Sequence, residues 1–155
     1  MTYDVIVVGT RVAGAATAML LARSGLRVLA IDRSAFPSDT ISSHQVQLPG
    51  IARLQRWGLL DRLVRAGTPA TARVRFDPGH VVIEGDFPAY EGVSALYSPR
   101  RTVLDPMLID AAREAGAEER PHRESQRPRD PVRGNALALP GHVGGDTLLP
   151  TKGAA

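Results

Sequence analysis

The segment YDVIVVGTRVAGAATAMLLARSGLRVLAIDR, residues 3–33, decides the fold. Its β-branched run Val5–Val8 predicts a parallel strand buried on both faces, because an unbroken apolar run leaves no side for water. Gly9 ends this strand, and the Ala-, Leu- and Met-rich residues 12–24 predict a helix. A second strand, residues 28–32, follows at once. The order predicts an α/β fold that opens with a Rossmann-like βαβ unit, in which the helix N-terminus binds a pyrophosphate.

The turn between the first strand and the helix carries two of the three glycines of the dinucleotide-binding fingerprint. Gly9 and Gly14 take the positions for the tight turn and for helix–strand contact, whereas Arg11 replaces the glycine that lets the pyrophosphate approach. Two interpretations of Arg11 remain open: its guanidinium contacts phosphate, or its Cβ crowds the ligand and tight binding is lost. The turn residues that we predict to bind a cofactor are Gly9, Thr10, Arg11, Val12, Ala13 and Gly14.

An acidic residue ends the second strand. Seventeen residues, 15–31, separate Gly14 from Asp32, where the fingerprint places a carboxylate that accepts hydrogen bonds from an adenosine ribose. A solvated turn aspartate is the alternative, which the preceding strand, turn and helix make less attractive. If a nicotinamide dinucleotide binds, Asp32 favours NAD over NADP, because a carboxylate repels a 2′-phosphate.

Composition narrows the class of protein. The 155 residues are 43% hydrophobic and 23% charged, which suits one globular domain with a sizeable core. The absence of cysteine excludes disulfides, thiolate nucleophiles and cysteine–metal sites, and we predict no metal. No apolar run reaches the ~20 residues that span a bilayer, and no signal peptide is recognisable, so we expect a cytoplasmic protein without a membrane span. The net charge of +3 comes from scattered arginines, which gives little support for nucleic-acid binding.

The middle of the chain alternates between a loop, short helices and short strands. Residues 34–49 predict a polar loop that either lines a ligand or merely connects elements, and within it His44 lacks an evident partner. Apolar spacing predicts two short helices broken at Gly58, with Trp57 in the core. Residues 72–76, 80–84 and 94–97 predict half-exposed antiparallel strands. The pair Asp105-Pro106 predicts the N-cap and first position of a helix over residues 107–115.

Three motifs follow one another in an informative order. They are the glycine turn with Asp32, the segment RLQRWGLLDRL at residues 53–63, and Arg101-Thr102-Val103-Leu104-Asp105 with Leu108 and Ala111-Ala112. Together they resemble the N-terminal part of FAD-dependent monooxygenases of the p-hydroxybenzoate hydroxylase and geranylgeranyl reductase type. The resemblance covers residues 3–117.

The resemblance implies that FAD lies extended across the sheet, with its pyrophosphate over the turn from Gly9 to Gly14 and its adenosine ribose on Asp32. Arg33 then lies by the adenine end, and Arg101 reaches the cofactor from the far side. In such enzymes NADPH or NADH reduces the flavin, which uses oxygen to modify an apolar or aromatic substrate, and reductase members pass hydride to a double bond. The strands between residues 72 and 97 supply part of the substrate wall.

The chain departs from this family after about residue 118. Family members carry a later Gly-Asp motif, and residues 144–146 have suitable letters but no strand before them and no helix after them. We expect residues 119–121, Glu-Arg-Pro, not to start a central strand. We therefore expect a truncated or frame-shifted chain, with a partial FAD-binding domain over residues 1–117 and a disordered tail over residues 118–155. A genuine short protein with such a tail is the alternative.

Three functions stay open at this level. The leading hypothesis is an FAD-binding oxidoreductase fragment that is incomplete for catalysis. The alternatives are a stand-alone NAD-binding Rossmann module and a gene remnant without independent activity. No residue is nominated as a catalytic acid, base or nucleophile, and neither the substrate nor the oligomeric state is predicted.

Overall fold

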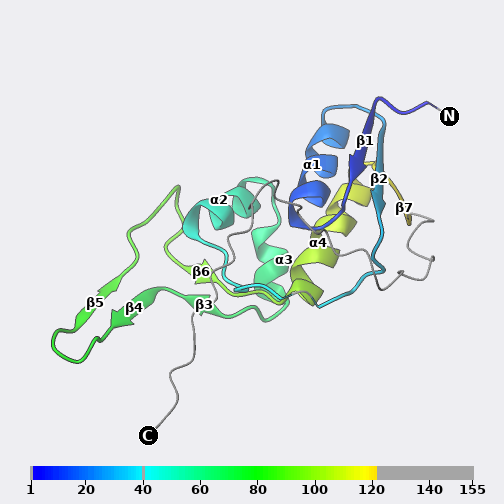
Figure 1. The fold of residues 1–155 in the computed structure, drawn as a ribbon. Helices are drawn as coiled ribbons and strands as arrows, with labels where there is room; N and C mark the ends of the chain where they lie inside the picture. Colours follow the sequence, from blue (N-terminus) through cyan, green and yellow to red (C-terminus); the bar gives the residue numbers. More distant parts are fainter. Residues whose placement is uncertain (1, 40, 122–155) are drawn as a thin grey trace, which may run out of the picture.

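A parallel sheet and the helix between its first two strands open the chain (Figure 1). The computed structural model describes residues 2–39 and 41–121. Strand β1 (Val5–Val8) pairs in parallel with β2 (Val28–Asp32), and helix α1 (Val12–Arg23) connects them. The register joins Val5 to Val28 and Val8 to Ile31. The βαβ unit and the α/β class predicted from the sequence are confirmed.

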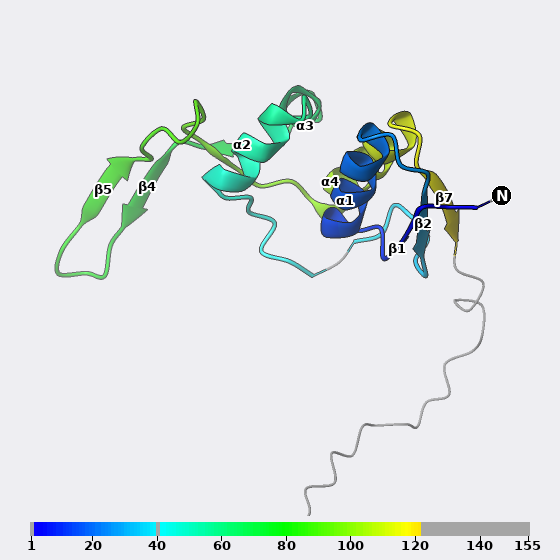
Figure 2. The ribbon, with the colours of Figure 1, turned by 90° about the horizontal axis from the view of Figure 1, so that it is seen from above.

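Two helices cover one face of this sheet. Helix α1 packs against α4 (Arg101–Glu114), and both lie on the same side of the strands (Figure 2). Small side chains at the contact let the helices approach closely, since each alanine adds little beyond the backbone. The fully or nearly fully buried residues of this layer are Ala15, Ala18, Met19, Leu108, Ile109, Ala111 and Ala112.

The opposite face of the sheet carries exposed apolar side chains. Ile6 is 59% exposed and Val8 79% exposed, whereas Val28 and Ala30 on the helix side are buried. The prediction that Val5–Val8 is buried on both faces is therefore wrong. The reason is that β1 is an edge strand of this sheet and that, within the described residues, helices cover only one of its faces.

A third strand, β7 (Glu118–Pro121), completes the described sheet in the order β1-β2-β7. It pairs in parallel with β2, from Leu29 opposite Glu118 to Asp32 opposite Pro121. The expectation that residues 119–121 do not start a central strand is not contradicted, because β7 is an edge strand of the described sheet, where a proline at the last position removes no essential ladder bond. The expectation of a disordered tail from residue 118 is wrong for Glu118–Pro121, which pair with β2, and the rest of the predicted tail, residues 122–155, lies outside the described residues.

Two short helices follow the loop after β2. Helix α2 (Leu48–Arg56) and helix α3 (Leu60–Arg65) are separated at Gly58, whose φ of +77° favours glycine. The predicted break is confirmed, although α2 starts at Leu48, inside the stretch predicted as loop. Trp57 is half-buried and packs against the core, as predicted.

The predicted antiparallel strands form two separate ribbons rather than one sheet. Strand β3 (Ala70–Thr71) pairs with β6 (Leu96–Tyr97), and β4 (Arg73–Phe76) pairs with β5 (Ile83–Asp86). The β4–β5 hairpin extends away from the helices (Figure 2). Its second strand starts three residues later than predicted.

Helix α4 (Arg101–Glu114) begins five residues earlier than its local signals indicate. Arg100 is the N-cap residue, with extended φ and ψ of −66° and 152°, and Pro106 lies inside the helix. The prediction that Asp105 caps the helix is wrong. Pro106 has no N–H to donate to the carbonyl of Thr102 four residues earlier, so the helix continues through this position with one hydrogen bond fewer.

Candidate cofactor-binding site

The glycine turn brings the start of α1 close to the end of β1. Gly9 has a φ of +93°, and its N–H donates to the carbonyl oxygen of Ile31 at 2.7 Å. A Cβ on Gly14 would lie 1.6 Å from the carbonyl oxygen of Gly9. Only glycine fits at position 14 in this backbone, so the helix–strand contact that the fingerprint assigns to this glycine is present.

The first turn of α1 is open to an anion. Its N-cap residue Arg11 makes no side-chain cap hydrogen bond, and no acidic residue lies in the first turn. The N–H groups at a helix start lack helical acceptors and form the positive end of the helix dipole. Val12 and Ala13 are exposed here. This end of the helix therefore suits phosphate oxygens.

The Asp32 carboxylate is hydrogen-bonded to the backbone of the glycine turn and of the loop after β2. The Oδ2 atom accepts a hydrogen bond from the Thr10 N–H at 2.6 Å, and Oδ1 accepts one from the Ser34 N–H at 2.7 Å. Burial alone would raise the pKa of Asp32, but the hydrogen bonds from Ser34 and Thr10, with the charge of Arg11, together lower it. Asp32 is thus ionised at neutral pH, with its orientation fixed. Thr10, which is 2% exposed, contributes its backbone N–H to this contact.

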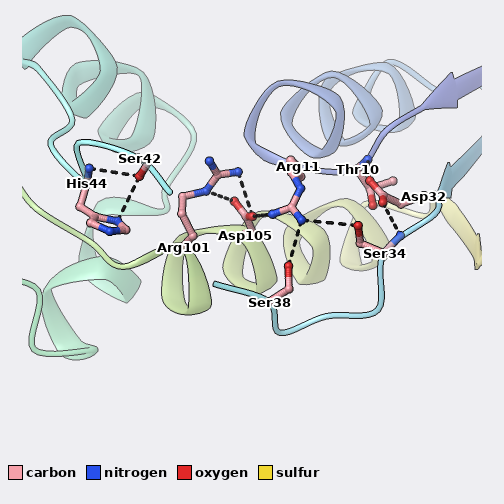
Figure 3. A network of polar contacts seen from close by, with 9 residues as sticks. All are labelled: Thr10, Arg11, Asp32, Ser34, Ser38, Ser42, His44, Arg101 and Asp105. Carbon is pink, nitrogen blue, oxygen red and sulfur yellow. Dashed lines mark hydrogen bonds and ion pairs between the residues drawn. The ribbon is translucent and has the colours of Figure 1, made fainter. Parts of the chain in front are cut away.

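Arg11 and Arg101 meet at one buried carboxylate, that of Asp105 (Figure 3). Asp105 Oδ2 lies 3.1 Å from Arg11 Nη1 and 2.9 Å from Arg101 Nη2, and Oδ1 lies 2.8 Å from Arg101 Nε. The Asp105 side chain has no exposed area, whereas the side chains of Arg101 and Arg11 are 15% and 33% exposed. The contact ties the glycine turn to helix α4.

The loop after β2 folds over the Arg11 guanidinium. Arg11 Nη2 donates to Ser38 Oγ at 2.9 Å and to Ser34 Oγ at 3.4 Å, and its Cζ lies 5.5 Å from the centre of the Phe36 ring. Part of the loop predicted at residues 34–49 therefore surrounds a predicted site residue. Arg11 is held on three sides beside the start of α1, and which of its two open interpretations applies stays a prediction.

Sequence reasoning missed Asp105 as a member of this group. Its position before a proline suggested a helix cap, and one of its two partners, Arg11, lies 94 residues away in the chain. A usable signal was present in the spacing of Arg101 and Asp105, which places the two side chains on one helix face.

Two further residues of the predicted region lie apart from this group. Arg33 follows Asp32 and is exposed. His44 has a φ of +54°, its Nδ1 atom lies 3.0 Å from Ser42 Oγ, and its N–H donates to the same oxygen at 3.1 Å. Figure 3 shows Ser42 and His44 beyond Arg101, on the side away from Asp32. The partner that the sequence did not reveal for His44 is therefore Ser42.

Other kinds of site are missing from the part of the chain that the structure describes. Across residues 2–39 and 41–121, no group of three or more metal-binding side chains is placed to hold an ion. Over the same residues, no helix combines the length and apolar character needed to cross a membrane.

Comparison with known proteins decides the family. The sequence profile described as "FAD binding domain" matches residues 2–137. The chain belongs to this FAD-binding domain family. The prediction of FAD as cofactor is confirmed, and the family match favours it over the alternative of a stand-alone NAD module.

Relatives of this FAD-binding domain are proteins of much greater length. It is 30% identical over 136 residues to 2,4-dichlorophenol 6-monooxygenase of Delftia acidovorans, covering 78% of this chain and 23% of that protein. The myxobacterial chondrochloren halogenase, an FAD-dependent halogenase, matches with a TM-score of 0.67 at 27% identity over 77% of this chain and 28% of its own. A flavoprotein/dehydrogenase of Cytophaga hutchinsonii matches with a TM-score of 0.65 at 25% identity over 77% of this chain and 30% of its own. The chain spans about a quarter of the length of these relatives.

The residues of the site fit the ADP part of FAD. Its two phosphates need N–H donors and positive charge, which the uncapped start of α1 and two guanidinium groups supply. Its ribose hydroxyls need an acceptor, and Asp32 is an ionised carboxylate at the end of β2. The donor set is therefore complementary to the charge of this part of the cofactor.

Proposed function

We propose that this FAD-binding domain holds the ADP part of FAD at the carboxyl ends of β1 and β2, as part of a flavin-dependent monooxygenase or related oxidoreductase. The observation that carries the proposal is the uncapped first turn of α1 with Arg11 beside it and Asp32 next to it. An anion site and a ribose acceptor adjoin each other there, which is the pairing that an adenosine diphosphate group requires.

Each residue has a separate role in this proposal. The N–H groups of residues 12–14 bind phosphate oxygens, with Gly9 and Gly14 setting the approach of turn and helix. Arg11 and Arg101 add positive charge, and Asp32 accepts from the ribose hydroxyls. Arg33, which is exposed after β2, lies by the adenine.

The proposed activity uses the chemistry of the flavin rather than that of a protein side chain. Reduced by NADPH or NADH, the flavin supplies reaction with oxygen or transfer of hydride. The protein binds and orients the cofactor. We propose an apolar or aromatic substrate, because the monooxygenase relative acts, by its name, on a dichlorophenol. The halogenase relative is an FAD-dependent enzyme too, so it supports cofactor binding and not one particular reaction.

We further propose that the 155-residue chain binds cofactor without completing a catalytic site. It spans about a quarter of the length of its relatives, and the described residues of its candidate site are groups that bind and orient. A partial FAD-binding domain over residues 1–117 and a location in the cytoplasm stay proposals of the same kind.

A titration with matched ligands tests the proposal. The purified chain is titrated with FAD, and with FMN, which lacks the adenosine part, while flavin fluorescence and heat are recorded. We expect FAD to bind with a Kd of about 10–100 μM, ADP to compete with it, and FMN to bind at least about tenfold more weakly. Failure to bind FAD at about 1 mM, or tighter binding of NAD than of FAD, would overturn the proposal.

A further inference from the structure

Asp105 is the most deeply buried charged side chain among residues 2–39 and 41–121. An ionised carboxylate without water is unfavourable by several kcal/mol unless charged donors surround it. Three N–H groups from two arginines do so here, at 2.8, 2.9 and 3.1 Å. Asp105 therefore depends on Arg11 and Arg101, and they depend on it for their orientation.

Helix stability alone does not explain this carboxylate. Aspartate is a poor helix former, and Pro106 beside it already removes one helical hydrogen bond. An apolar residue of similar size in place of a buried ion pair often leaves a fold equally stable or more stable. Stability alone therefore does not require this arrangement, which holds two guanidinium groups in a fixed position.

For Arg11 the fixed position is beside the start of α1, and for Arg101 it is on the other side of Asp105. Arg11 is the N-cap residue of that helix, and Arg101 is held by Asp105 in a two-bonded contact through Nε and Nη2. In Figure 3 the Nη1 end of Arg101 points away from Asp105. Two positive charges against the one negative charge of Asp105 leave this cluster with a charge of +1. The ionised Asp32 on the other side of Thr10 offsets that charge, so the adjacent Arg11 guanidinium and the helix dipole are what favour a phosphate there.

We propose that Asp105 is a positioning residue for FAD, holding Arg11 and Arg101 so that both guanidinium groups face the pyrophosphate. The inference rests on the proposed function, because it takes the start of α1 as the pyrophosphate site. Asp105 itself acts through the arginines and does not touch the cofactor. The opposite role, in which Asp105 competes with phosphate for Arg11, is an outcome of the test.

The test measures binding of ADP and of adenosine to the full chain, the second lacking phosphate. Asp105→Asn keeps the shape of the side chain and removes its charge. We expect it to lower ADP affinity about tenfold and to leave adenosine affinity unchanged, a difference that a merely structural role does not produce. In an Arg11→Ala background the same substitution should lower ADP affinity by less than it does in the wild type, because one of the two residues through which it acts is gone.

Asp110→Asn is the matched control. Asp110 lies on the same helix, is 54% exposed and pairs with Arg113 at 2.8 Å, so this variant makes the same charge change away from the site. It should alter neither affinity. Circular dichroism at each titration temperature establishes that Asp105→Asn is folded, and Asp105→Glu provides a second variant if the asparagine variant unfolds. The longer carboxylate should then shift both guanidinium groups and weaken ADP more than adenosine.

The outcomes separate the two proposals. Wild-type binding of FAD and ADP that Asp105→Asn leaves unchanged, or that it strengthens, overturns the positioning role while the proposed function stands. Equal loss of ADP and adenosine binding also overturns it, since the effect is then structural. A wild-type chain that binds neither FAD nor ADP overturns the proposed function and this inference together.

Discussion

Gly14 lies against Gly9 so closely that a Cβ on Gly14 would be 1.6 Å from the Gly9 carbonyl oxygen. The atom in the way belongs to the backbone of the turn, so no side-chain rotation relieves the clash. The contact fixes the distance between the end of β1 and the start of α1, and therefore the place of the N–H groups that we propose to bind phosphate.

Gly14→Ala should consequently destabilise the fold by roughly 3 kcal/mol and weaken FAD binding, because helix and turn must separate. Gly85→Ala is the control: Gly85 lies in β5, where an added Cβ meets nothing within 4 Å. Chemical denaturation of both variants measures the effect. Equal denaturation midpoints for the two alanine variants would show that the turn accommodates a Cβ at position 14 without loss of stability.

Asp32 should make stability depend on acidity. The folded protein lowers its pKa below the ordinary value of 3.8, so its contribution is fully present above that value and is lost as pH falls through the folded pKa. Asp32→Asn removes this contribution at neutral pH. We expect the variant to have a lower free energy of unfolding than wild type at pH 7. The difference between the two free energies should narrow as the pH falls below about 4.

Wild type must be compared with the variant, because other carboxylates with lowered pKa values also make stability fall in the same acidic pH range. The pKa values of Asp4, which pairs with Arg27, and of Glu114, which pairs with Arg62, are lowered as well. The difference between wild type and Asp32→Asn isolates the one group. A gap that stays constant from pH 7 to pH 3 would exclude a lowered pKa for Asp32.

The βαβ unit could be predicted because its signals are local. The run Val5–Val8, the glycine turn and the helix-forming residues after it each lie within a few residues of what they determine. Strand β7 could not, because Glu118–Pro121 is polar and owes its conformation to pairing with β2, far away in the sequence. The exposure of β1 likewise depends on which elements flank the sheet.

The candidate site was partly predictable for the same reason. Gly9, Gly14 and Asp32 stand at fixed spacings in one continuous segment, and the structure brings them together. Asp105 was misplaced because its local context, a following proline, signals a helix start. Its ion pair with Arg11 joins two segments that no short-range pattern links, and it is satisfied only inside a helix that begins at Arg101.

Two substitutions of Arg11 separate its charge from its bulk. Arg11→Ala removes the guanidinium and keeps the Cβ, whereas Arg11→Gly removes both. If the guanidinium holds phosphate, both variants should bind FAD about tenfold more weakly than wild type. If the Cβ crowds the ligand, the glycine variant should bind more tightly than the alanine variant. We expect the first result, since Arg11 is held beside the start of α1 by Asp105 and Ser38.

Fluorescence titration with FAD gives the affinities directly. Stability measurements on both variants are the control, because each leaves Asp105 with Arg101 as its remaining charged partner. Affinities equal to wild type in both variants would mean that neither charge nor bulk at this position matters.

The exposed apolar face of β1 should cause the isolated chain to self-associate. Ile6 and Val8 are 59% and 79% exposed on one face of an edge strand, a combination that favours association between chains. Ile6→Thr with Val8→Thr keeps the β-branched shape and reduces apolar area. This double variant should lower the fraction of self-associated protein in light scattering and the fluorescence of a bound apolar dye.

Val7→Thr, on the helix side and packed against the core, should instead lower stability and leave self-association undiminished. Association that persists unchanged in the double variant would place the adhesive surface elsewhere, and the exposed Phe76 and Ile83 of the β4–β5 hairpin would be the next pair to substitute.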